Sequence, residues 1–206
     1  MRGIAPLTKW VVLLGAALAT ALAGVPAAHA DEIEVSDAHL SSTEDGVTLA
    51  ADFAFELKPR LAEAVANGIP LYFVVEFELT RPRWYWFDEK AAAKRLQLRL
   101  SYHALSRHYR LSTGVLQQNY PTLEDALNVL RRVRNWLVVE RGAVLADANY
   151  EVAVRMRLDV TLLPKPFQLT ALTSRELNLE SPWKRFSFRP PPSPLEARES
   201  KEAEAR

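Results

Sequence analysis

Apolar and polar residues alternate along much of this sequence. In four segments, 47–57, 71–79, 96–102 and 150–160, apolar side chains occupy every second position, and charged or polar side chains occupy many of the positions between them. A strand with this period has one face in a protein core and the other in solvent, as in antiparallel sheets. The pattern therefore predicts four half-buried antiparallel strands.

A further strand is predicted at the start of this region, over residues 33–42. It is joined to the next strand by Glu44-Asp45-Gly46, a sequence typical of a tight turn. The parity of its apolar positions changes between Val35 and Ala38. One extra residue at Ser36-Asp37 would return both halves of the strand to the core face, so we expect a β-bulge there.

Two helices are predicted between the strands. The first covers residues 59–67, with a proline in its first turn and Gly68 at its end. The second begins after Thr122, a good N-cap, and its apolar stripe extends from Leu123 to Leu137. Four arginines are expected on the outer, solvated face of this helix: Arg131, Arg132, Arg134 and Arg141.

The C-terminal part is predicted to contain a loop at Leu163-Pro164-Lys165-Pro166 and two short strands, 176–179 and 183–188. Many antiparallel strands with two inserted helices indicate an α+β protein, mainly antiparallel, and we predict a single-domain β-sandwich over residues 31–189. A partly open β-barrel is the alternative. Residues 190–206 are rich in proline and then in charge, so this tail is expected to be disordered.

The first thirty residues read as an export signal. Two basic residues precede a largely apolar run from Trp10 to Val25, and Ala28-His29-Ala30 has the small-x-small pattern that signal peptidase recognises. The run is shorter than the ~20 residues that a membrane-spanning helix needs. We therefore predict a signal peptide over residues 1–30, a mature chain that begins at Asp31, and a periplasmic location. An uncleaved membrane anchor is the alternative.

The amino-acid composition argues against two classes of function, thiol chemistry and nucleic-acid binding. The chain contains no cysteine, so it has no disulfide and no thiol chemistry. Residues 31–206 contain 24 basic and 25 acidic residues, a net charge of −1. A nucleic-acid-binding protein needs a basic surface to replace the counterions around phosphates. The charge balance therefore argues against a nucleic-acid partner.

Two histidines are candidates for a metal site. If residues 104–107 form a hairpin loop, His103 and His108 lie opposite each other, and the same register pairs Tyr102 with Tyr109. A zinc site needs a third or fourth ligand, and none is identifiable nearby in the sequence. We interpret the two histidines as a cross-strand polar pair and predict neither a metal nor a cofactor.

Other catalytic patterns are missing from the sequence. There is no Gly-x-Ser-x-Gly nucleophile motif and no glycine-rich phosphate loop, and the acidic residues fit turns, helix starts and solvated strand faces. We therefore predict that the protein is not an enzyme.

An unusual aromatic segment lies between two of the predicted strands. Four consecutive aromatic residues are flanked by charged residues in Arg81-Pro82-Arg83-Trp84-Tyr85-Trp86-Phe87-Asp88-Glu89-Lys90. Successive residues of an extended chain point to opposite faces, so a single sheet face can bury only half of them. Tryptophan, tyrosine and arginine are over-represented at binding hot spots. We predict a partner-binding surface formed by Arg81, Arg83, Trp84, Tyr85, Trp86 and Phe87; the alternative is that another structural layer covers the tryptophans.

This segment, with three other motifs, resembles a proteobacterial family of secreted proteins known as domain of unknown function 4390. The other motifs are Gly68-Ile69-Pro70-Leu71, Leu163-Pro164-x-Pro166 and Trp183-x-x-Phe186, and the resemblance covers residues 31–188. It implies an exported single-domain protein with no assigned activity and no known catalytic residues. Members are often encoded beside a membrane sensor kinase, which implies a role in the cell envelope.

Three functions follow from these features. The first is a periplasmic, non-enzymatic binding or accessory module that contacts an envelope protein, such as a sensor kinase, through the aromatic and basic surface. The second is a carrier of an apolar ligand or lipid, and the third is a hydrolase or metalloenzyme. A weak contact between the arginines of the second helix and anionic lipid headgroups is a further alternative.

Overall fold

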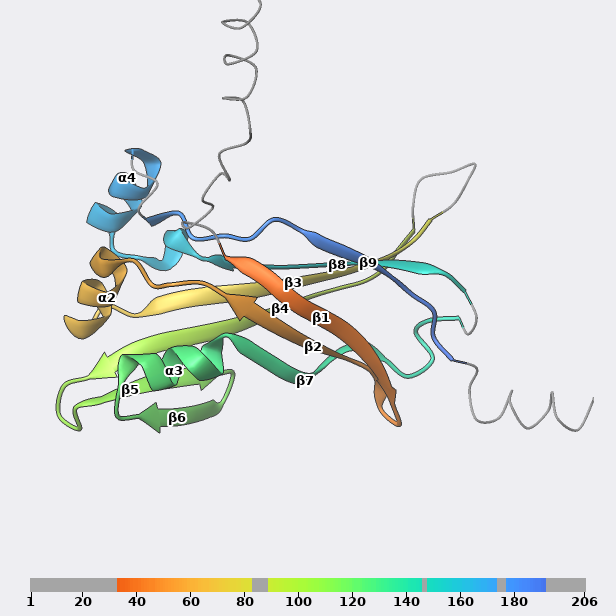
Figure 1. The fold of residues 1–206 in the computed structure, drawn as a ribbon, viewed down its shortest axis with the longest axis horizontal. Coiled ribbons are helices and arrows are strands. Elements are labelled where there is room, and N and C mark those ends of the chain that lie inside the picture. The colour runs from red at the N-terminus through yellow and green to blue at the C-terminus, as the bar shows by residue number, and fades with distance from the viewer. Residues whose placement is uncertain (1–32, 83–88, 146–147, 174–176, 192–206) are drawn as a thin grey trace, which may run out of the picture. The chain divides into compact units, whose positions relative to one another are not determined.

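The protein is described by a computed structural model, in which residues 33–82, 89–145, 148–173 and 177–191 are placed (Figure 1). The predicted signal peptide, most of the aromatic segment and most of the predicted tail lie outside the described residues. The elements follow the order β1 (Glu34–Thr43), β2 (Gly46–Ala54), α2 (Pro59–Ala66), β3 (Leu71–Arg81), β4 (Glu89–His103), β5 (His108–Thr113), β6 (Leu116–Tyr120), α3 (Leu123–Leu130), β7 (Arg132–Glu140), β8 (Tyr150–Leu158), the short 3-10 turn η2 (Val160–Leu162), α4 (Lys165–Thr173) and β9 (Lys184–Phe188).

The strands form two antiparallel sheets. One has the order β1-β2-β7, and the other has the order β6-β5-β4-β3-β8-β9. Figure 1 shows α3 beside β5, β6 and β7, and α2 and α4 close together at one end of the strands. Over the described residues the sheets do not close into a barrel, so the predicted α+β sandwich is confirmed.

The core lies between the inner faces of the two sheets. The odd-numbered residues of β3 from Leu71 to Leu79 are fully buried or nearly so, as the alternation predicts. The rings of Trp136 and Phe77 form a T-shaped pair with 6.4 Å between their centroids, and this contact joins β7 of one sheet to β3 of the other. Apolar side chains therefore fill the interior, and their burial supplies the main drive for folding.

Two details of strand pairing were predicted correctly. The register of β1 against β2 shifts between Val35 and Asp37, which confirms the bulge. His103 lies opposite His108 in the β4–β5 hairpin, as the four-residue loop requires. At the turn between β1 and β2, Gly46 has φ 142°, and a Cβ atom there would lie 2.1 Å from the carbonyl oxygen of Val139. Only glycine fits this close approach of two backbones.

The prediction of a long second helix is wrong after its second turn. Thr122 caps α3 by accepting a hydrogen bond from the Asp125 N–H (3.1 Å), but the helix ends at Leu130 and residues 132–140 form strand β7. Asn135 has φ 51° and lies at a register shift, so Val133 and Trp136 both face the core although they are three positions apart. A bulge in a strand can therefore place core-facing residues three positions apart, which is also the spacing of apolar residues in a helix.

The four arginines assigned to that helix therefore lie elsewhere. Arg131 follows the last turn of α3, and its guanidinium stacks 5.3 Å from the centroid of the Phe55 ring. Arg132 and Arg134 belong to β7, and Arg141 lies in the turn after it. Three of the four surround a depression of about 390 Å³ beside Asp52.

Three other expectations also differ from the structure. The predicted loop at 163–166 contains the start of α4, because Pro166 lies in the first turn, where a helix needs no N–H. Of the strand predicted at 176–179, the described residues 177–179 form no strand, and Glu180 directly after them forms an isolated bridge with Arg157. β6 was not predicted, because Leu116–Tyr120 contains only one large aliphatic residue. The last predicted strand is confirmed as β9.

Candidate binding surface on the six-stranded sheet

The outward face of the six-stranded sheet carries a group of charged residues centred on β3. Glu76 lies opposite Arg95 on β4 and opposite Arg155 on β8. Side chains directly opposite on neighbouring strands are close enough to interact. Strand order thus places one carboxylate between arginines from two strands that are far apart in the sequence.

Glu76 is almost completely buried by its cationic neighbours. Its side chain is 6% exposed, and its oxygens lie 2.6 Å from Nε of Arg155 and 3.1 Å from Nε of Arg95. A third guanidinium, that of Arg157, lies 3.6 Å away. A buried carboxylate in solvent-poor surroundings is stable only when such partners compensate for lost hydration.

The pKa of Glu76 reflects a competition between burial and these neighbours. Burial alone raises the pKa, because it disfavours the charged carboxylate. The hydrogen bond from Arg155 and the positive charges of Arg155, Arg157 and Arg95 act in the opposite direction, and together they hold the pKa of Glu76 below its ordinary value. Glu76 is therefore ionised at neutral pH, and its charge holds the three arginine side chains in place.

The arginines around Glu76 still reach the surface. The side chain of Arg95 is 75% exposed, and those of Arg155 and Arg157 are about one quarter exposed, at 28% and 26%. The Arg155 guanidinium stacks 4.5 Å from the centroid of the Trp183 ring. This stacking and the ion pairs orient the guanidinium groups before any ligand arrives.

More arginines extend the charged area along the same face. Arg99 is exposed and lies 5.8 Å from the centroid of the Tyr72 ring, and Arg110 donates a hydrogen bond to the side-chain oxygen of Asn119 (3.2 Å). Arg185 on β9 pairs with Glu151 (3.3 Å). We call this group the arginine surface; it comprises Arg95, Arg99, Arg110, Arg155, Arg157 and Arg185.

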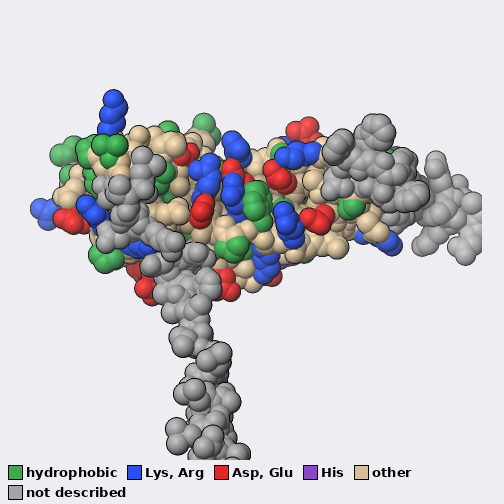
Figure 2. Space-filling view, turned by 90° about the horizontal axis from the view of Figure 1, so that it is seen from above, with side chains coloured by type: hydrophobic (Ala, Val, Ile, Leu, Met, Phe, Trp, Pro, Cys, Tyr) green, Lys and Arg blue, Asp and Glu red, His purple; other side chains and the backbone are tan. Residues whose placement is uncertain are grey.

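The arginine surface has more positive than negative charge. The acidic residues that share this face include Glu76, Glu78 and Glu151 on the strands and Asp159 directly after β8, which lies 3.8 Å from Arg157. Glu78 is also paired with Lys90 (2.8 Å). Figure 2 shows positive and negative side chains side by side along the middle of the visible face. An excess of exposed guanidinium groups suits the recognition of carboxylates or phosphates, which they can bind in bidentate geometry.

Only one of the predicted partner-binding residues can be placed. Arg81 ends β3 and forms an ion pair with Glu89 (2.6 Å) across the base of the β3–β4 hairpin. The remaining predicted residues, Arg83, Trp84, Tyr85, Trp86 and Phe87, lie outside the described residues. The hairpin itself is part of the six-stranded sheet, so this segment continues directly from two strands of the arginine surface.

The paired histidines lie at the other end of β4. Nδ1 of His103 is 3.0 Å from the hydroxyl oxygen of Ser106, and Nδ1 of His108 hydrogen-bonds the backbone oxygen of the same serine. Across the described residues, no three His, Asp or Glu side chains are grouped so that they could hold a metal ion. The observed partners of both histidines are hydrogen-bonding groups of the hairpin loop.

The arginine surface was not predicted from the sequence. The alternation did assign Arg95, Arg99, Arg155 and Arg157 to solvated strand faces. It did not show that β4 and β8 flank β3, and this strand order brings the arginines together around Glu76. A signal was present in the sequence, because an acidic residue in the middle of a very apolar strand needs cationic partners on the strands beside it.

Fold and surface together define a class: an antiparallel β-sandwich with a cationic sheet face. Residues 30–187 match the family described as Domain of unknown function (DUF4390), so the chain belongs to this family, as the motifs indicated. Neither the curated proteins nor the solved structures contain a match. None of the described helices combines the length and the apolar character that crossing a bilayer requires.

Proposed function

We propose that this protein is an exported, non-enzymatic binding module. In this proposal the arginine surface and the adjoining aromatic segment bind an acidic region of an envelope protein. Export is inferred from the signal-like residues 1–30, and the choice of a protein partner rests on the combination of arginine with tryptophan and tyrosine.

The observation that carries the proposal is the arginine excess, which folding does not require. Within the described residues, Arg99 and Arg110 contact a phenol ring and an amide rather than carboxylates. Arg99 is exposed and Arg110 is partly exposed, and surface charges of this kind contribute little to stability. They do raise the association rate of an oppositely charged partner and fix its orientation. A binding role explains why several of them share one face.

The three arginines beside Asp52, which are Arg131, Arg132 and Arg134, are weaker candidates for binding a partner. Arg131 pairs with Glu124 (2.6 Å) and Arg134 pairs with Asp52, and both arginines also donate to backbone carbonyls. Their charges are therefore largely compensated within the protein. Strand β7 and the turn after it are therefore suitable for control substitutions.

The test is affinity capture from envelope extracts with charge-reversed variants. Arg99→Glu with Arg110→Glu should abolish capture and leave the melting temperature nearly unchanged, because both side chains contact neutral groups. Arg132→Glu on β7 with Arg141→Glu in the turn after β7 changes the net charge equally, outside the arginine surface, and should leave capture intact. Equal capture by both double variants would contradict the proposal.

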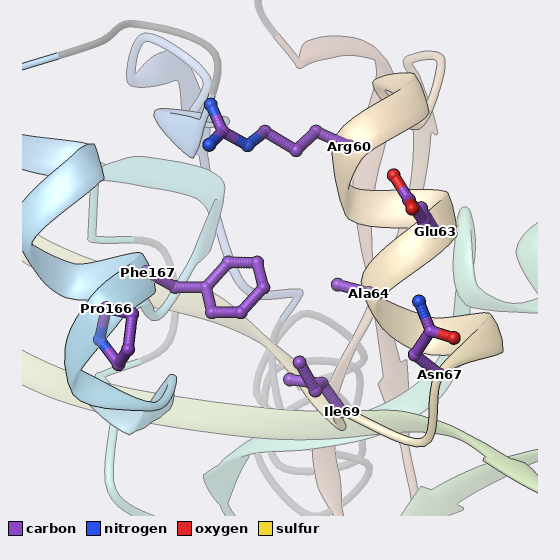
Figure 3. Close-up of a pocket in the computed structure, with 7 residues that line it drawn as sticks. All are labelled: Arg60, Glu63, Ala64, Asn67, Ile69, Pro166 and Phe167. Atoms are coloured by element: carbon purple, nitrogen blue, oxygen red, sulfur yellow. The ribbon is translucent and has the colours of Figure 1, made fainter.

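A groove between α2 and α4 supports a second candidate function, the carrier of an apolar ligand. Its volume is about 260 Å³, and Figure 3 shows Phe167 projecting from α4 and Ile69 at one end of the groove, while Arg60 and Glu63 project from α2. Ligand pockets usually enclose about 300–1,000 Å³, so this groove suits only a short apolar chain. This groove is the observation that favours a carrier.

The carrier function predicts that a fluorescent apolar probe such as N-phenylnaphthylamine binds saturably to the protein. Phe167→Ser should abolish that binding, whereas Leu116→Ser, an equivalent change at an exposed site on β6, should not. Absence of saturable binding by the unmodified protein would exclude the carrier function for this groove.

A further inference from the structure

The two sheets differ in how their edge strands are protected. In the part of the chain that the structure describes, the edge strands are β1 and β7 of one sheet and β6 and β9 of the other. An edge strand presents unpaired N–H and C=O groups to which another chain can add, and proteins usually block such edges with charge, proline, bulges or covering elements.

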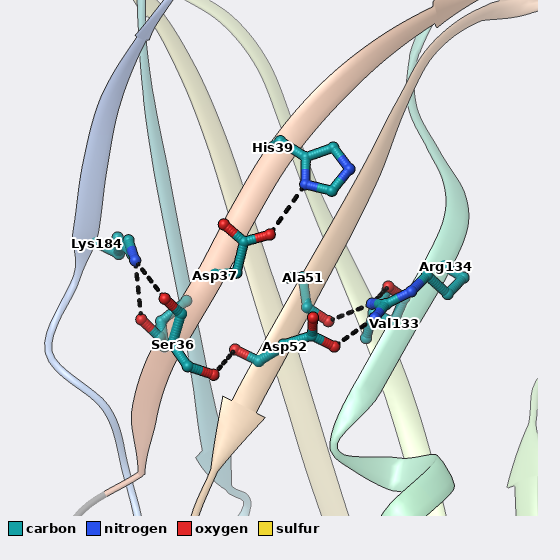
Figure 4. A network of polar contacts seen from close by, with 9 residues as sticks. Ser36, Asp37, His39, Ala51, Asp52, Val133, Arg134 and Lys184 are labelled. Carbon is teal, nitrogen blue, oxygen red and sulfur yellow. Dashed lines mark hydrogen bonds and ion pairs between the residues drawn. The ribbon is translucent and has the colours of Figure 1, made fainter.

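Three of these edges carry such protection. β1 contains the bulge at Ser36, and the Lys184 ammonium group donates to the carbonyl oxygens of Val35 (3.1 Å) and Ser36 (2.9 Å), as Figure 4 shows. β7 has two register shifts and two arginines. β9 contains Lys184 and Arg185 and is followed by prolines.

β6 differs from the other edges. Its sequence, Leu-Gln-Gln-Asn-Tyr, contains no charge, proline or glycine, and its pairing with β5 is regular throughout. The four residues Leu116–Asn119 are exposed, and Leu116 is 69% exposed. Val115, in the adjacent turn, is 97% exposed. This edge therefore lacks the protection found at the other three edges, and its first residue, Leu116, is an exposed apolar residue.

The hairpin turn determines which backbone groups are available. Gly114, with φ 57°, and Val115 form a two-residue turn, so the pair Thr113 and Leu116 that closes it is hydrogen-bonded. Hydrogen-bonded and non-bonded pairs alternate from there along β6. The N–H and C=O groups of Gln117 and Asn119 consequently point away from β5, toward solvent.

We propose that β6 pairs with β6 of a second copy of this chain, antiparallel, about a two-fold axis through Gln118. In this register Leu116 lies opposite Tyr120 of the second copy, and Gln117 lies opposite Asn119 of the second copy. The outward N–H and C=O groups of Gln117 and Asn119 then form the new ladder hydrogen bonds. Gln118 lies opposite Gln118 of the second copy.

The strand's own sequence argues for a second copy as the occupant. Antiparallel self-pairing places an aliphatic side chain against an aromatic ring on one face and amides against amides on the other, which are favourable cross-strand pairs. No like charges meet, although β6 lies beside a strongly cationic face. The interface is short, so the dimer is weak and forms reversibly.

The geometry also has a consequence for binding. A two-fold axis perpendicular to the sheet joins the two six-stranded sheets edge to edge and keeps both arginine surfaces on the same side. A partner with repeated acidic segments would then be bound at two places, which strengthens binding without new contacts. This consequence rests on the proposed function, whereas the dimer itself does not.

Crosslinking is the test, and the cysteine-free sequence makes it unambiguous. In the variant Gln118→Cys the two thiols lie in a non-hydrogen-bonded pair with Cα atoms about 4.5 Å apart, within the range of a disulfide. In the control Gln117→Cys the two thiols are offset by two positions and lie about 8 Å apart, beyond that range. At concentrations where sedimentation shows dimer, oxidation should crosslink the Gln118→Cys variant about a hundredfold faster than the control, because paired thiols experience millimolar effective concentrations.

Charge variants provide an independent check by sedimentation velocity. Gln118→Lys and Gln118→Glu should each be monomeric, because like charges then meet on the axis, and a mixture of the two should dimerise again. Gln118 is exposed, so both variants should remain folded, which circular dichroism verifies. Equal crosslinking rates for the two cysteine variants, or a purely monomeric unmodified protein at millimolar concentration, would overturn the proposal.

Discussion

The substitution Glu76→Gln tests the electrostatic centre of the arginine surface most directly. It preserves the shape of the side chain but leaves the guanidinium groups of Arg95, Arg155 and Arg157 without their shared counter-charge. Removal of one partner from a fully buried ion pair costs about 3–5 kcal/mol. Here the arginines are partly exposed and can regain hydration, so we expect a loss of about 2 kcal/mol in the free energy of unfolding.

The matched control is Glu78→Gln, two positions along the same face of β3. The Glu78 side chain is 37% exposed and pairs with Lys90, whose side chain is 54% exposed. A surface pair of this kind contributes less than about 1 kcal/mol. Urea denaturation of both variants at pH 7 should therefore separate them, and Glu76→Gln should also lower the melting temperature by about 4–8 °C.

The pH dependence provides a second measurement. The pKa of Glu76 is lower in the folded protein than in the unfolded chain, where it has its ordinary value of 4.5. Its contribution to stability is therefore complete above the ordinary pKa and is lost as the pH falls through the lower, folded-state pKa. The difference in stability between the unmodified protein and Glu76→Gln should shrink over that acidic range. A difference that stays constant on acidification, or two variants of equal stability at pH 7, would refute the reasoning.

Three further predictions concern other parts of the chain. Gly46→Ala should destabilise the protein by more than about 2 kcal/mol in urea denaturation, because its Cβ would collide with a backbone oxygen of β7; a loss below about 0.5 kcal/mol would mean that the turn adapts. Replacing His103 and His108 by Ala should change stability by less than about 1 kcal/mol, and elemental analysis of the unmodified protein should show no stoichiometric zinc or copper. Replacing Trp84 and Trp86 by Ser should abolish partner capture at a cost below about 1 kcal/mol; a cost of about 3–5 kcal/mol per residue would instead place them in the core.

Much of the sandwich could be predicted because the alternation of apolar and polar residues shows which face of each strand is buried. The odd-numbered residues of β3 and the bulge near Ser36 follow from parity alone. The β4–β5 register follows from loop length and from the match of apolar with apolar positions. These features depend on residues close together in the sequence, where local physical rules are sufficient.

The features that were not predicted depend on pairing between strands that are far apart in the sequence. Val133 and Trp136 have helical spacing, and only pairing with β2 shows that a bulge at Asn135 produces it. The arginines on β4 and β8 meet because both strands flank β3, an arrangement that depends on the whole fold. A sequence can show that a side chain is solvated, but its neighbours across a sheet depend on strand order.

The contact between Lys184 and the β1 bulge joins the two ends of the folded region. The residues involved are 149 positions apart in the sequence, and nearby the Ile33 N–H donates to the carbonyl oxygen of Glu180 (3.2 Å). Contacts of such long range form late, because closure of a long loop costs entropy before the contact forms. Folding of this protein therefore cannot be completed until its last strand is available. A partly synthesised chain would hold hairpins with open edges, and the sandwich would close only when the C-terminal strand has been added.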